Sequence, residues 1–178
     1  MVQHFTVLQR ETVDLLQPRP AGVYVDGTLG GGGHSDELLR RSSPDGRVIG
    51  LYQDEGACVR AAERLAGFGG RIEIRQANFR NVAEVLADLG IDAIDGGVLD
   101  LGVSWFHLRT PERGFSFQSD GPLDMRMDQR AARTAADLVN TLSRQELTAI
   151  LREYGEEQKA ALIAKAIEKA RARGPITT

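Results

Sequence analysis

A short apolar run followed by four glycines and a helix constrains the fold of this chain more than any other stretch. Residues 23–25 (Val-Tyr-Val) are of the β-branched and aromatic kind that occurs in buried strands. Four glycines occupy residues 30–33, and residues 35–41 predict a helix with Ser35 as its N-cap. A strand, a glycine turn and a helix let a ligand reach backbone N–H groups without a Cβ in the way. We interpret the stretch as a cradle for a nucleotide-type cofactor; the alternative is a flexible glycine hairpin without a ligand.

The same alternation of strand and helix continues downstream. Strands are predicted over residues 23–25, 47–52, 71–75 and 94–100, with helices over residues 36–41, 56–65 and 82–89 between them. This alternation favours an α/β fold with a parallel sheet. Residues 104–130 are rich in Gly, Pro, Phe, Met and charge, and we expect no regular element there. Helices are predicted again over residues 135–140, 143–154 and 156–173. The expected division is a cofactor-binding domain over residues 1–130 and a helical subdomain over residues 131–178.

The composition excludes several classes of protein. With 178 residues, 42% of them hydrophobic and 26% charged, the chain can build one well-packed domain with an appended subdomain. Its single cysteine, Cys58, permits neither an intrachain disulfide nor a cysteine metal site, and we expect no metal. We find no basic segment followed by an apolar core at the N-terminus and no apolar run of membrane-spanning length. These features favour a cytoplasmic protein that does not associate with a membrane.

The type of cofactor is less clear from the glycines alone. In dinucleotide-binding folds, an acid at the end of the second strand usually holds the ribose hydroxyls. That position is Tyr52 here, and Asp54 could replace the acid only if the loop turned back. The spaced G-x-G-x-x-G pattern of NAD sites is also missing. The run of glycines by itself does not separate NAD from S-adenosylmethionine.

Three longer motifs are more specific. They are residues 26–34 (Asp-Gly-Thr-Leu-Gly-Gly-Gly-Gly-His), 100–104 (Asp-Leu-Gly-Val-Ser) and 113–127 (Arg-Gly-Phe-Ser-Phe-Gln-Ser-Asp-Gly-Pro-Leu-Asp-Met-Arg-Met). Together they resemble the bacterial ribosomal RNA small-subunit methyltransferase H family, and the likeness extends from His4 to Thr178. The resemblance implies a Rossmann-like class I methyltransferase sheet and S-adenosylmethionine as methyl donor. It also implies methylation of the exocyclic N4 of a cytosine in 16S ribosomal RNA, with that RNA or the small ribosomal subunit as partner.

The resemblance also implies roles for individual residues. The implied cofactor contacts are Gly32, Gly33, His34, Tyr52, Phe79, Asp100 and His107. Asp100 and Asp124 are the candidate catalytic residues, as acceptors of a hydrogen bond from the exocyclic amine. An aromatic side chain would stack on the cytosine, and the candidates are Trp105, Phe115 and Phe117. Simpler interpretations stay open, with Phe79 as a core residue and Asp124 and Arg126 as a local ion pair.

The chain also departs from the family pattern. Tyr52 stands where the family has an acid for the ribose, and loss of such a charge-assisted hydrogen bond costs about 1.5–3 kcal/mol, or roughly ten- to a hundredfold in affinity. Trp105 replaces a small residue beside the reactive end of the site, His107 replaces a common Gln, and Arg109 replaces an acid. These departures leave a second function open, a non-catalytic binding or scaffold module with the same fold.

Length is the largest departure, because members of the family continue beyond this sequence and complete the sheet with further strands. The present residues supply an incomplete sheet, predicted in the order 3-2-1-4, with a truncated helical subdomain. Its fourth strand would be an apolar edge containing Ile94, Val98 and Leu99, which is prone to pairing. Either the sequence is part of a longer chain or a partner covers the edge, and a homodimer is one such arrangement.

Overall fold

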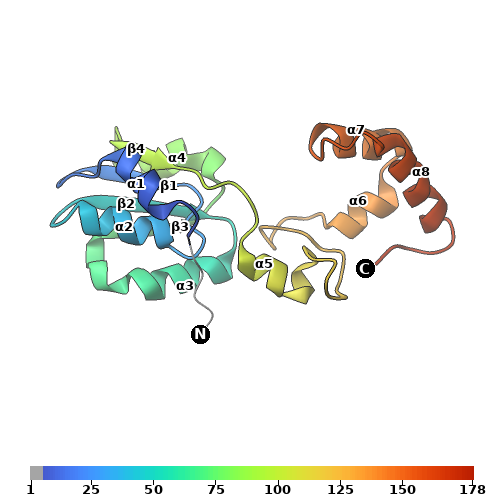
Figure 1. Cartoon of the computed structure of the whole chain (residues 1–178), viewed down its shortest axis with the longest axis horizontal. Helices are drawn as coiled ribbons and strands as arrows, with labels where there is room; N and C mark the ends of the chain where they lie inside the picture. The colour runs from blue at the N-terminus through green and yellow to red at the C-terminus, as the bar shows by residue number, and fades with distance from the viewer. Residues whose placement is uncertain (1–5) are drawn as a thin grey trace. The chain divides into compact units, whose positions relative to one another are not determined.

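The computed structural model describes residues 6–178, so His4 lies outside the described residues. The chain forms two compact units, Met1–Gly102 and Val103–Thr178, whose elements Figure 1 labels. The sequence predicts a cofactor-binding domain over residues 1–130 and a helical subdomain over residues 131–178. That division stays a prediction. None of the helices within residues 6–178 is both long enough and apolar enough to cross a bilayer.

The first unit contains a four-stranded parallel sheet in the order β3-β2-β1-β4, as predicted. Its strands are β1 (Val23–Asp26), β2 (Arg47–Tyr52), β3 (Ile72–Gln76) and β4 (Gly96–Val98). The register pairs Val25 with Ile49 and, on the other side of β1, with Gly97. Because all strands run in the same direction, their carboxyl ends meet at one edge of the sheet, where open α/β sheets bind ligands.

Helices cover this sheet. They are α1 (Gln9–Leu16), α2 (Gly33–Arg41), α3 (Glu55–Leu65) and α4 (Val82–Asp88), with 3-10 turns η1 (Ala66–Arg71) and η2 (Phe79–Asn81). Buried Val25, Ile49 and Leu51 form a core cluster against which Val82 and Leu86 of α4 pack. Side chains alternate along a strand, so Tyr24 and Val48 face the other side, where α2 and α3 contact the central strands. The two-sided cover explains why the central strands are apolar throughout.

Strand β4 is shorter than predicted and lies at the edge of the described sheet. It ends at Val98, so Asp100 follows the strand and does not belong to it. A Cβ on Gly96 would lie 2.9 Å from a Leu16 methyl group, so the glycine lets this strand approach α1. Val98 is buried, whereas the flanking Ile94 and Leu99 are exposed. The apolar edge expected from the sequence is therefore present in this structure.

The second unit consists of short helices joined by a long loop. They are α5 (Trp105–Arg109), η3 (Pro111–Arg113), α6 (Ala135–Thr141), α7 (Arg144–Glu153) and α8 (Ala160–Arg171). The expectation of no regular element over residues 104–130 was wrong, because that range contains α5 and η3. Ser104 begins α5 with a reciprocal capping box to His107, and Pro111 occupies the first turn of η3.

Candidate cofactor and substrate sites

The glycine loop joins β1 to α2 through two left-handed residues. Gly30 has φ +48° and Gly32 has φ +76°, a region where a side chain is strained. Helix α2 begins at Gly33, and no side chain within the described part of the chain caps it. The prediction of Ser35 as N-cap was wrong: Gly32 occupies that position, and the Ser35 hydroxyl donates to Asp26 instead. The first N–H groups of α2 are therefore left without a side-chain acceptor. Such N–H groups at the start of a helix can bind an anion or a polar group of a ligand.

Asp26 fixes the conformation of the glycine loop through hydrogen bonds. Its carboxylate accepts hydrogen bonds from the Ser35 hydroxyl at 2.7 Å and from the Thr28 N–H at 3.2 Å. Burial raises the pKa of Asp26 above its usual value, although these hydrogen bonds and the nearby His34 oppose the shift. The carboxylate thus ties the end of β1 to the first turn of α2, and it holds the loop in shape.

His34 is the residue of the loop best placed to hold a ligand. Its side chain is only 5% exposed, yet its Nε2 has no hydrogen-bond partner among residues 6–178. A buried polar atom without a partner is costly and therefore rare. An orphaned imidazole nitrogen beside an uncapped glycine turn fits a polar cofactor such as S-adenosylmethionine.

The end of β2 offers no carboxylate for a ribose. Tyr52 is buried, and its carbonyl oxygen accepts from the Ala77 N–H at 3.0 Å and the Cys58 thiol at 3.6 Å. Asp54 is also buried, and its Oδ1 caps α3 by accepting from the Ala57 N–H at 2.7 Å. The Asp54 carboxylate therefore serves as the cap of α3.

Three loops converge where β1 ends. A Cβ on Gly27 would lie 2.5 Å from a Leu99 methyl carbon and 3.1 Å from Phe79 Cβ. The Asp100 N–H donates to the Thr28 hydroxyl at 2.7 Å, which fixes the loop after β4 against the loop after β1. Phe79 remains 38% exposed, so it is a half-open surface residue and not a core residue. The first unit therefore brings Gly32, Gly33, His34, Tyr52, Phe79 and Asp100 to the carboxyl edge of one sheet.

The other two predicted site residues lie in the second unit. His107 is buried, and its Nδ1 lies 3.0 Å from the Ser104 hydroxyl, while its ring lies 5.2 Å from that of Phe115. The imidazole therefore fixes the start of α5. On the same helix, the guanidinium of Arg109 lies over the Trp105 ring, so two of the departures from the family pattern contact each other.

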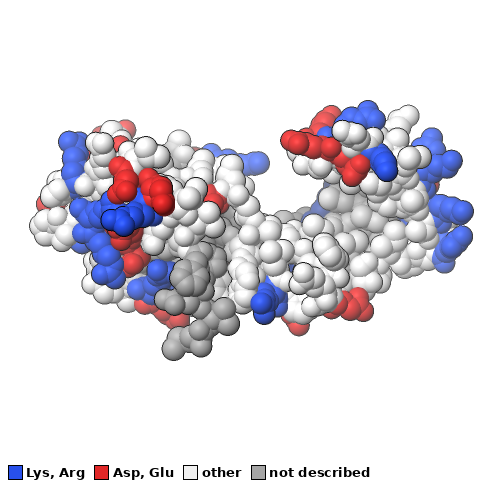
Figure 2. All heavy atoms as spheres, viewed as in Figure 1, with Lys and Arg blue, Asp and Glu red and all other residues white. Residues whose placement is uncertain are grey.

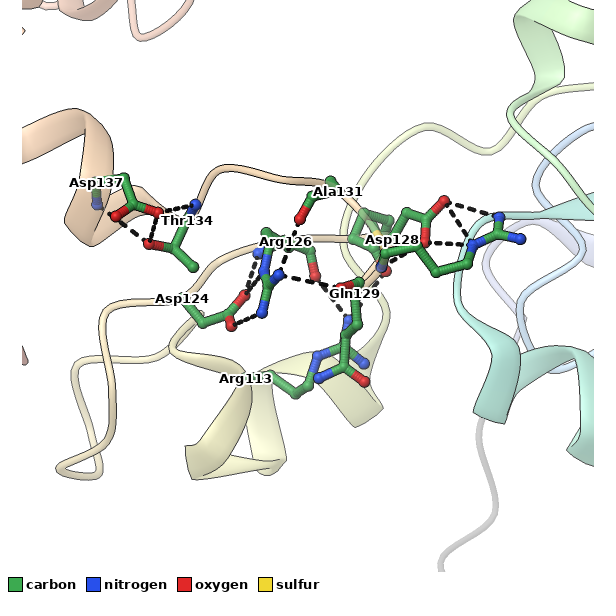
Figure 3. A network of polar contacts seen from close by, with 10 residues as sticks. Arg113, Asp124, Arg126, Asp128, Gln129, Ala131, Thr134 and Asp137 are labelled. Carbon is green, nitrogen blue, oxygen red and sulfur yellow. Dashed lines mark hydrogen bonds and ion pairs between the residues drawn. The ribbon is translucent and has the colours of Figure 1, made fainter.

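Asp124 lies in a polar network that shapes the loop between η3 and α6 (Figure 3). Arg126 donates to both of its carboxylate oxygens, at 2.9 and 2.7 Å, and this pairing lowers the pKa of Asp124. Arg113 donates to the carbonyl oxygens of Arg126 and Met127 at 2.8 and 3.0 Å. The local ion pair considered from the sequence is therefore present. Nothing in the spacing of the motif indicated the arginine-to-carbonyl contacts, because they depend on how the loop folds back.

The same loop surrounds a hollow of about 580 Å³ within the second unit. Phe115, Phe117, Leu123 and Met125 supply its apolar lining, and Gln118 and Asp120 supply polar groups. Phe117 is fully exposed, which is unusual for a phenylalanine without a partner surface. The volume of the hollow falls within the usual range of small-molecule sites. No group of three His, Cys, Asp or Glu side chains in residues 6–178 is arranged to hold a metal ion.

Comparison with known proteins decides the family. The profile of the MraW methylase family matches residues 1–178. The chain belongs to the MraW methylase family. It is 52% identical over 176 residues to ribosomal RNA small subunit methyltransferase H of Syntrophotalea carbinolica, covering 99% of this chain and 56% of that protein. It is 55% identical over 175 residues to the protein of the same name from Carboxydothermus hydrogenoformans, covering 98% of this chain and 56% of that protein.

The chain thus spans about half the length of these curated relatives. Among solved structures, an S-adenosylmethionine-dependent O-methyltransferase from Thermotoga maritima is 18% identical, with a TM-score of 0.40, and covers 44% of this chain and 31% of its own. A second, an S-adenosylmethionine-dependent methyltransferase from Aquifex aeolicus, is 15% identical with a TM-score of 0.35, over 39% and 38%. The family and the Rossmann-like sheet inferred from the motifs are confirmed by the family match and the strand order. S-adenosylmethionine is the methyl donor of this family, as the motifs implied.

Proposed function

We propose that this chain is the S-adenosylmethionine-binding part of an enzyme that methylates the exocyclic N4 of a cytosine in small-subunit ribosomal RNA. The observation that carries this proposal is its identity of 52–55% to relatives named ribosomal RNA small subunit methyltransferase H, over nearly all of the chain. The unpartnered His34 nitrogen at an uncapped glycine turn supports it independently.

The residues at the sheet edge take distinct roles in this proposal. The Gly32 N–H already donates to the Leu29 carbonyl oxygen at 2.6 Å, so Gly32 contributes the left-handed turn of the loop. The Gly33 N–H and the His34 Nε2 hold polar groups of the cofactor, and the half-exposed Phe79 ring flanks its adenine. When bound, S-adenosylmethionine supplies an electrophilic methyl group on a positively charged sulfur. Asp100 follows β4 at the same edge, where its carboxylate accepts a hydrogen bond from the exocyclic amine and orients it. Positioning of this kind is the main contribution that a protein makes to a direct displacement.

The resemblance also implies roles for Asp124 and His107, which belong to the second unit. Both oxygens of Asp124 accept from Arg126, but each carboxylate oxygen has two lone pairs, so Oδ2 can also accept from a substrate amine while the ion pair stays formed. The role of His107 as a cofactor contact rests on the resemblance alone. Both assignments remain proposals based on the resemblance.

The hollow of the second unit is proposed to receive the target base. A cytosine in a duplex is out of reach for such a reaction, so it has to be unpaired or flipped. Phe117 and Phe115 line the hollow, and aromatic side chains of this kind stack on splayed-out bases of RNA. The partner is then 16S ribosomal RNA or the small ribosomal subunit, and the expected location is the cytoplasm. A homodimer that covers the β4 edge is also proposed, and a monomer in light scattering would exclude it.

The buried Tyr52 and the capping role of Asp54 favour a second candidate function. Without a carboxylate at the end of β2, the chain would bind the ribose weakly and act as a non-catalytic binding or scaffold module with the same fold. The two candidates differ in their affinity for the cofactor, not in their fold.

Calorimetric titration with S-adenosylmethionine separates them. The wild-type chain is compared with Tyr52→Asp, and Tyr52→Phe is the matched control because it keeps the ring but adds no carboxylate. Micromolar binding by the wild type supports the methyltransferase. Binding by Tyr52→Asp alone indicates a pocket that is disabled at the ribose. Absence of binding in the wild type and in both variants contradicts the proposed cofactor site and favours the scaffold.

A further inference from the structure

The second unit carries an excess of positive charge that the whole chain does not show. Residues 103–178 contain 12 Lys and Arg against 10 Asp and Glu, whereas residues 1–102 contain 10 against 15. All three lysines of the chain, Lys159, Lys165 and Lys169, lie on or next to α8. Figure 2 shows Lys and Arg atoms gathered along the outer edge of this unit, over the helix that Figure 1 labels α8.

Three of these cations form a line. Lys165, Lys169 and Arg173 are spaced by four residues, which places successive side chains on one helix face about 6 Å apart. Arg173 follows the last residue of α8, but its N–H still donates to the Ala170 carbonyl at 3.0 Å and continues the turn. All three side chains belong to exposed residues, and none forms an ion pair within the described part of the chain.

Two other cations of this unit, Arg171 of α8 and Arg144 of α7, have structural partners and so differ from this line. Arg171 donates to the carbonyl oxygens of Val139 and Leu142 at 2.8 and 2.7 Å, in the last turn and at the C-cap of α6. Arg144 lies 3.7 Å from Glu168. Like charges four residues apart repel one another, so a line of three unpaired cations weakens the helix unless an anion binds it.

The chain that follows the line reaches the hollow that the loop between η3 and α6 surrounds. The segment after Arg173 is fixed to that loop: the Leu123 N–H donates to the Thr177 carbonyl at 2.8 Å, and Thr178 lines the hollow. Asn140 holds the segment from the other side by exchanging two hydrogen bonds with the Ile176 backbone, at 2.8 and 2.9 Å. Arg173 and Thr178 are five positions apart in the sequence, so their Cα atoms are at most about 18 Å apart.

We propose that Lys165, Lys169 and Arg173 form a phosphate track, which binds the backbone of the RNA strand that flanks the base held in the hollow. A linear row of cations fits successive phosphates of a single strand better than it fits one compact anion, which would require converging groups. The proposal rests on the proposed function for the identity of the strand. It assigns no part of the track to cofactor binding.

The salt dependence of RNA binding tests the track. The probe is a short fluorescein-labelled single-stranded RNA without secondary structure, titrated with the chain between about 50 and about 200 mM salt. The triple variant Lys165→Gln, Lys169→Gln, Arg173→Gln keeps good helix formers and removes three positive charges. The matched control is Arg10→Gln, Arg47→Gln, Arg152→Gln, which removes the same charge from exposed positions without an ion pair among residues 6–178.

Three phosphate contacts contribute about 2 to the slope of log affinity against log salt, and about a hundredfold in affinity near 0.1 M salt. We expect the track variant to lose both and the control to retain both. An unchanged slope in the track variant overturns the proposal, and so does a wild-type chain that does not bind the RNA at all. Calorimetry with S-adenosylmethionine separates this failure from that of the proposed function. If the track variant loses slope but the wild type does not bind the cofactor, the track stands and the proposed function fails. If the wild type binds the cofactor but the slope of the track variant equals that of the wild type, only the track is removed.

Discussion

The guanidinium of Arg109 lies over the indole of Trp105, with 4.3 Å between Cζ and the ring centroid. The two residues are four positions apart on α5, where side chains share a face. Trp105 also meets Phe106 edge to face, with 6.1 Å between the ring centroids. Two departures from the family pattern that look independent in the sequence therefore form one contact, and the cation at position 109 compensates for the large ring at position 105.

This contact predicts a coupling between the two residues. In a double-mutant cycle with Trp105→Leu and Arg109→Gln, we expect a coupling free energy of about 0.5–1 kcal/mol, as for cation–π pairs at exposed sites. Urea unfolding of the four proteins measures it. Arg109→Lys is the control, because it keeps a cation near the ring. Additive single effects would show that the two side chains do not stabilise each other.

Two adjacent glycines of the loop are expected to respond differently to alanine. Gly32 has a left-handed φ of +76°, and its added Cβ would lie 3.1 Å from Leu65, so Gly32→Ala should destabilise the fold by about 1–2 kcal/mol. The added Cβ of Gly31 meets nothing within 4 Å, so Gly31→Ala should leave the free energy of unfolding nearly unchanged. Thermal or urea unfolding compares the two, and equal losses would mean that the left-handed turn is not required.

His34 is expected to contribute to the binding of S-adenosylmethionine and not to the free energy of unfolding. Because its Nε2 has no partner among residues 6–178, His34→Leu removes no hydrogen bond of that nitrogen and should not lower the free energy of unfolding. The affinity for S-adenosylmethionine should fall by about 0.5–1.5 kcal/mol, or roughly two- to tenfold. His107→Leu is the contrasting variant, since it breaks the contact with Ser104 and should lower stability. A His34→Leu chain with unchanged affinity would remove His34 from the cofactor site.

Asp124 should stabilise the fold in a pH-dependent way. Its pairing with Arg126 lowers its pKa in the folded state, so the stabilisation is present above the unfolded value of about 3.9 and is lost as the pH falls through the folded value. Asp124→Asn should cost about 1.5–3 kcal/mol at neutral pH and much less in acid. Urea unfolding at both pH values measures the difference. Asp120→Asn is the control from the same loop, and equal pH profiles for the two variants would contradict the pairing.

The contribution of Asp26 to stability should change with pH in the opposite direction. Burial raises its pKa in the folded state, so the folded chain binds this proton more readily than the unfolded chain. Its contribution is greatest below the unfolded value of about 3.9 and declines as the pH rises through the folded value. Asp26→Asn should remove this decline from the pH profile of unfolding, and a profile identical to that of the wild type would show that the carboxylate ionises freely.

Much of the fold could be predicted because its determinants are local in the sequence. The alternation of apolar strands with helical segments predicts the parallel sheet, and the motifs around Gly30–Gly33 and after β4 predict a cofactor site at its carboxyl edge. The start of α2 could not be predicted in the same way. Ser35 has the residue type of an N-cap, but the left-handed turn at Gly32 begins the helix earlier, and buried Asp26 takes the Ser35 hydroxyl.

The second unit was harder to predict because its order comes from contacts that the sequence pattern does not record. Ser104 and His107 have the spacing of a capping box, but His at its last position is an uncommon partner, and the five-residue α5 is too short for a periodic signal. Arg113 holds its loop through main-chain carbonyl groups, which every residue has, so no residue type marks the contact. The contact between Arg109 and Trp105 belongs to the same class.

The close approach at Gly27 has a consequence for how this chain can change over evolutionary time. Any side chain at position 27 would meet a Leu99 methyl carbon at 2.5 Å and Phe79 at 3.1 Å. The Leu99 methyl carbon is the end of an exposed, flexible side chain, so an alanine at position 27 would require Leu99 to change its rotamer. The residues at positions 27 and 99 are therefore coupled, and a smaller residue at position 99 would leave more room for a change at Gly27.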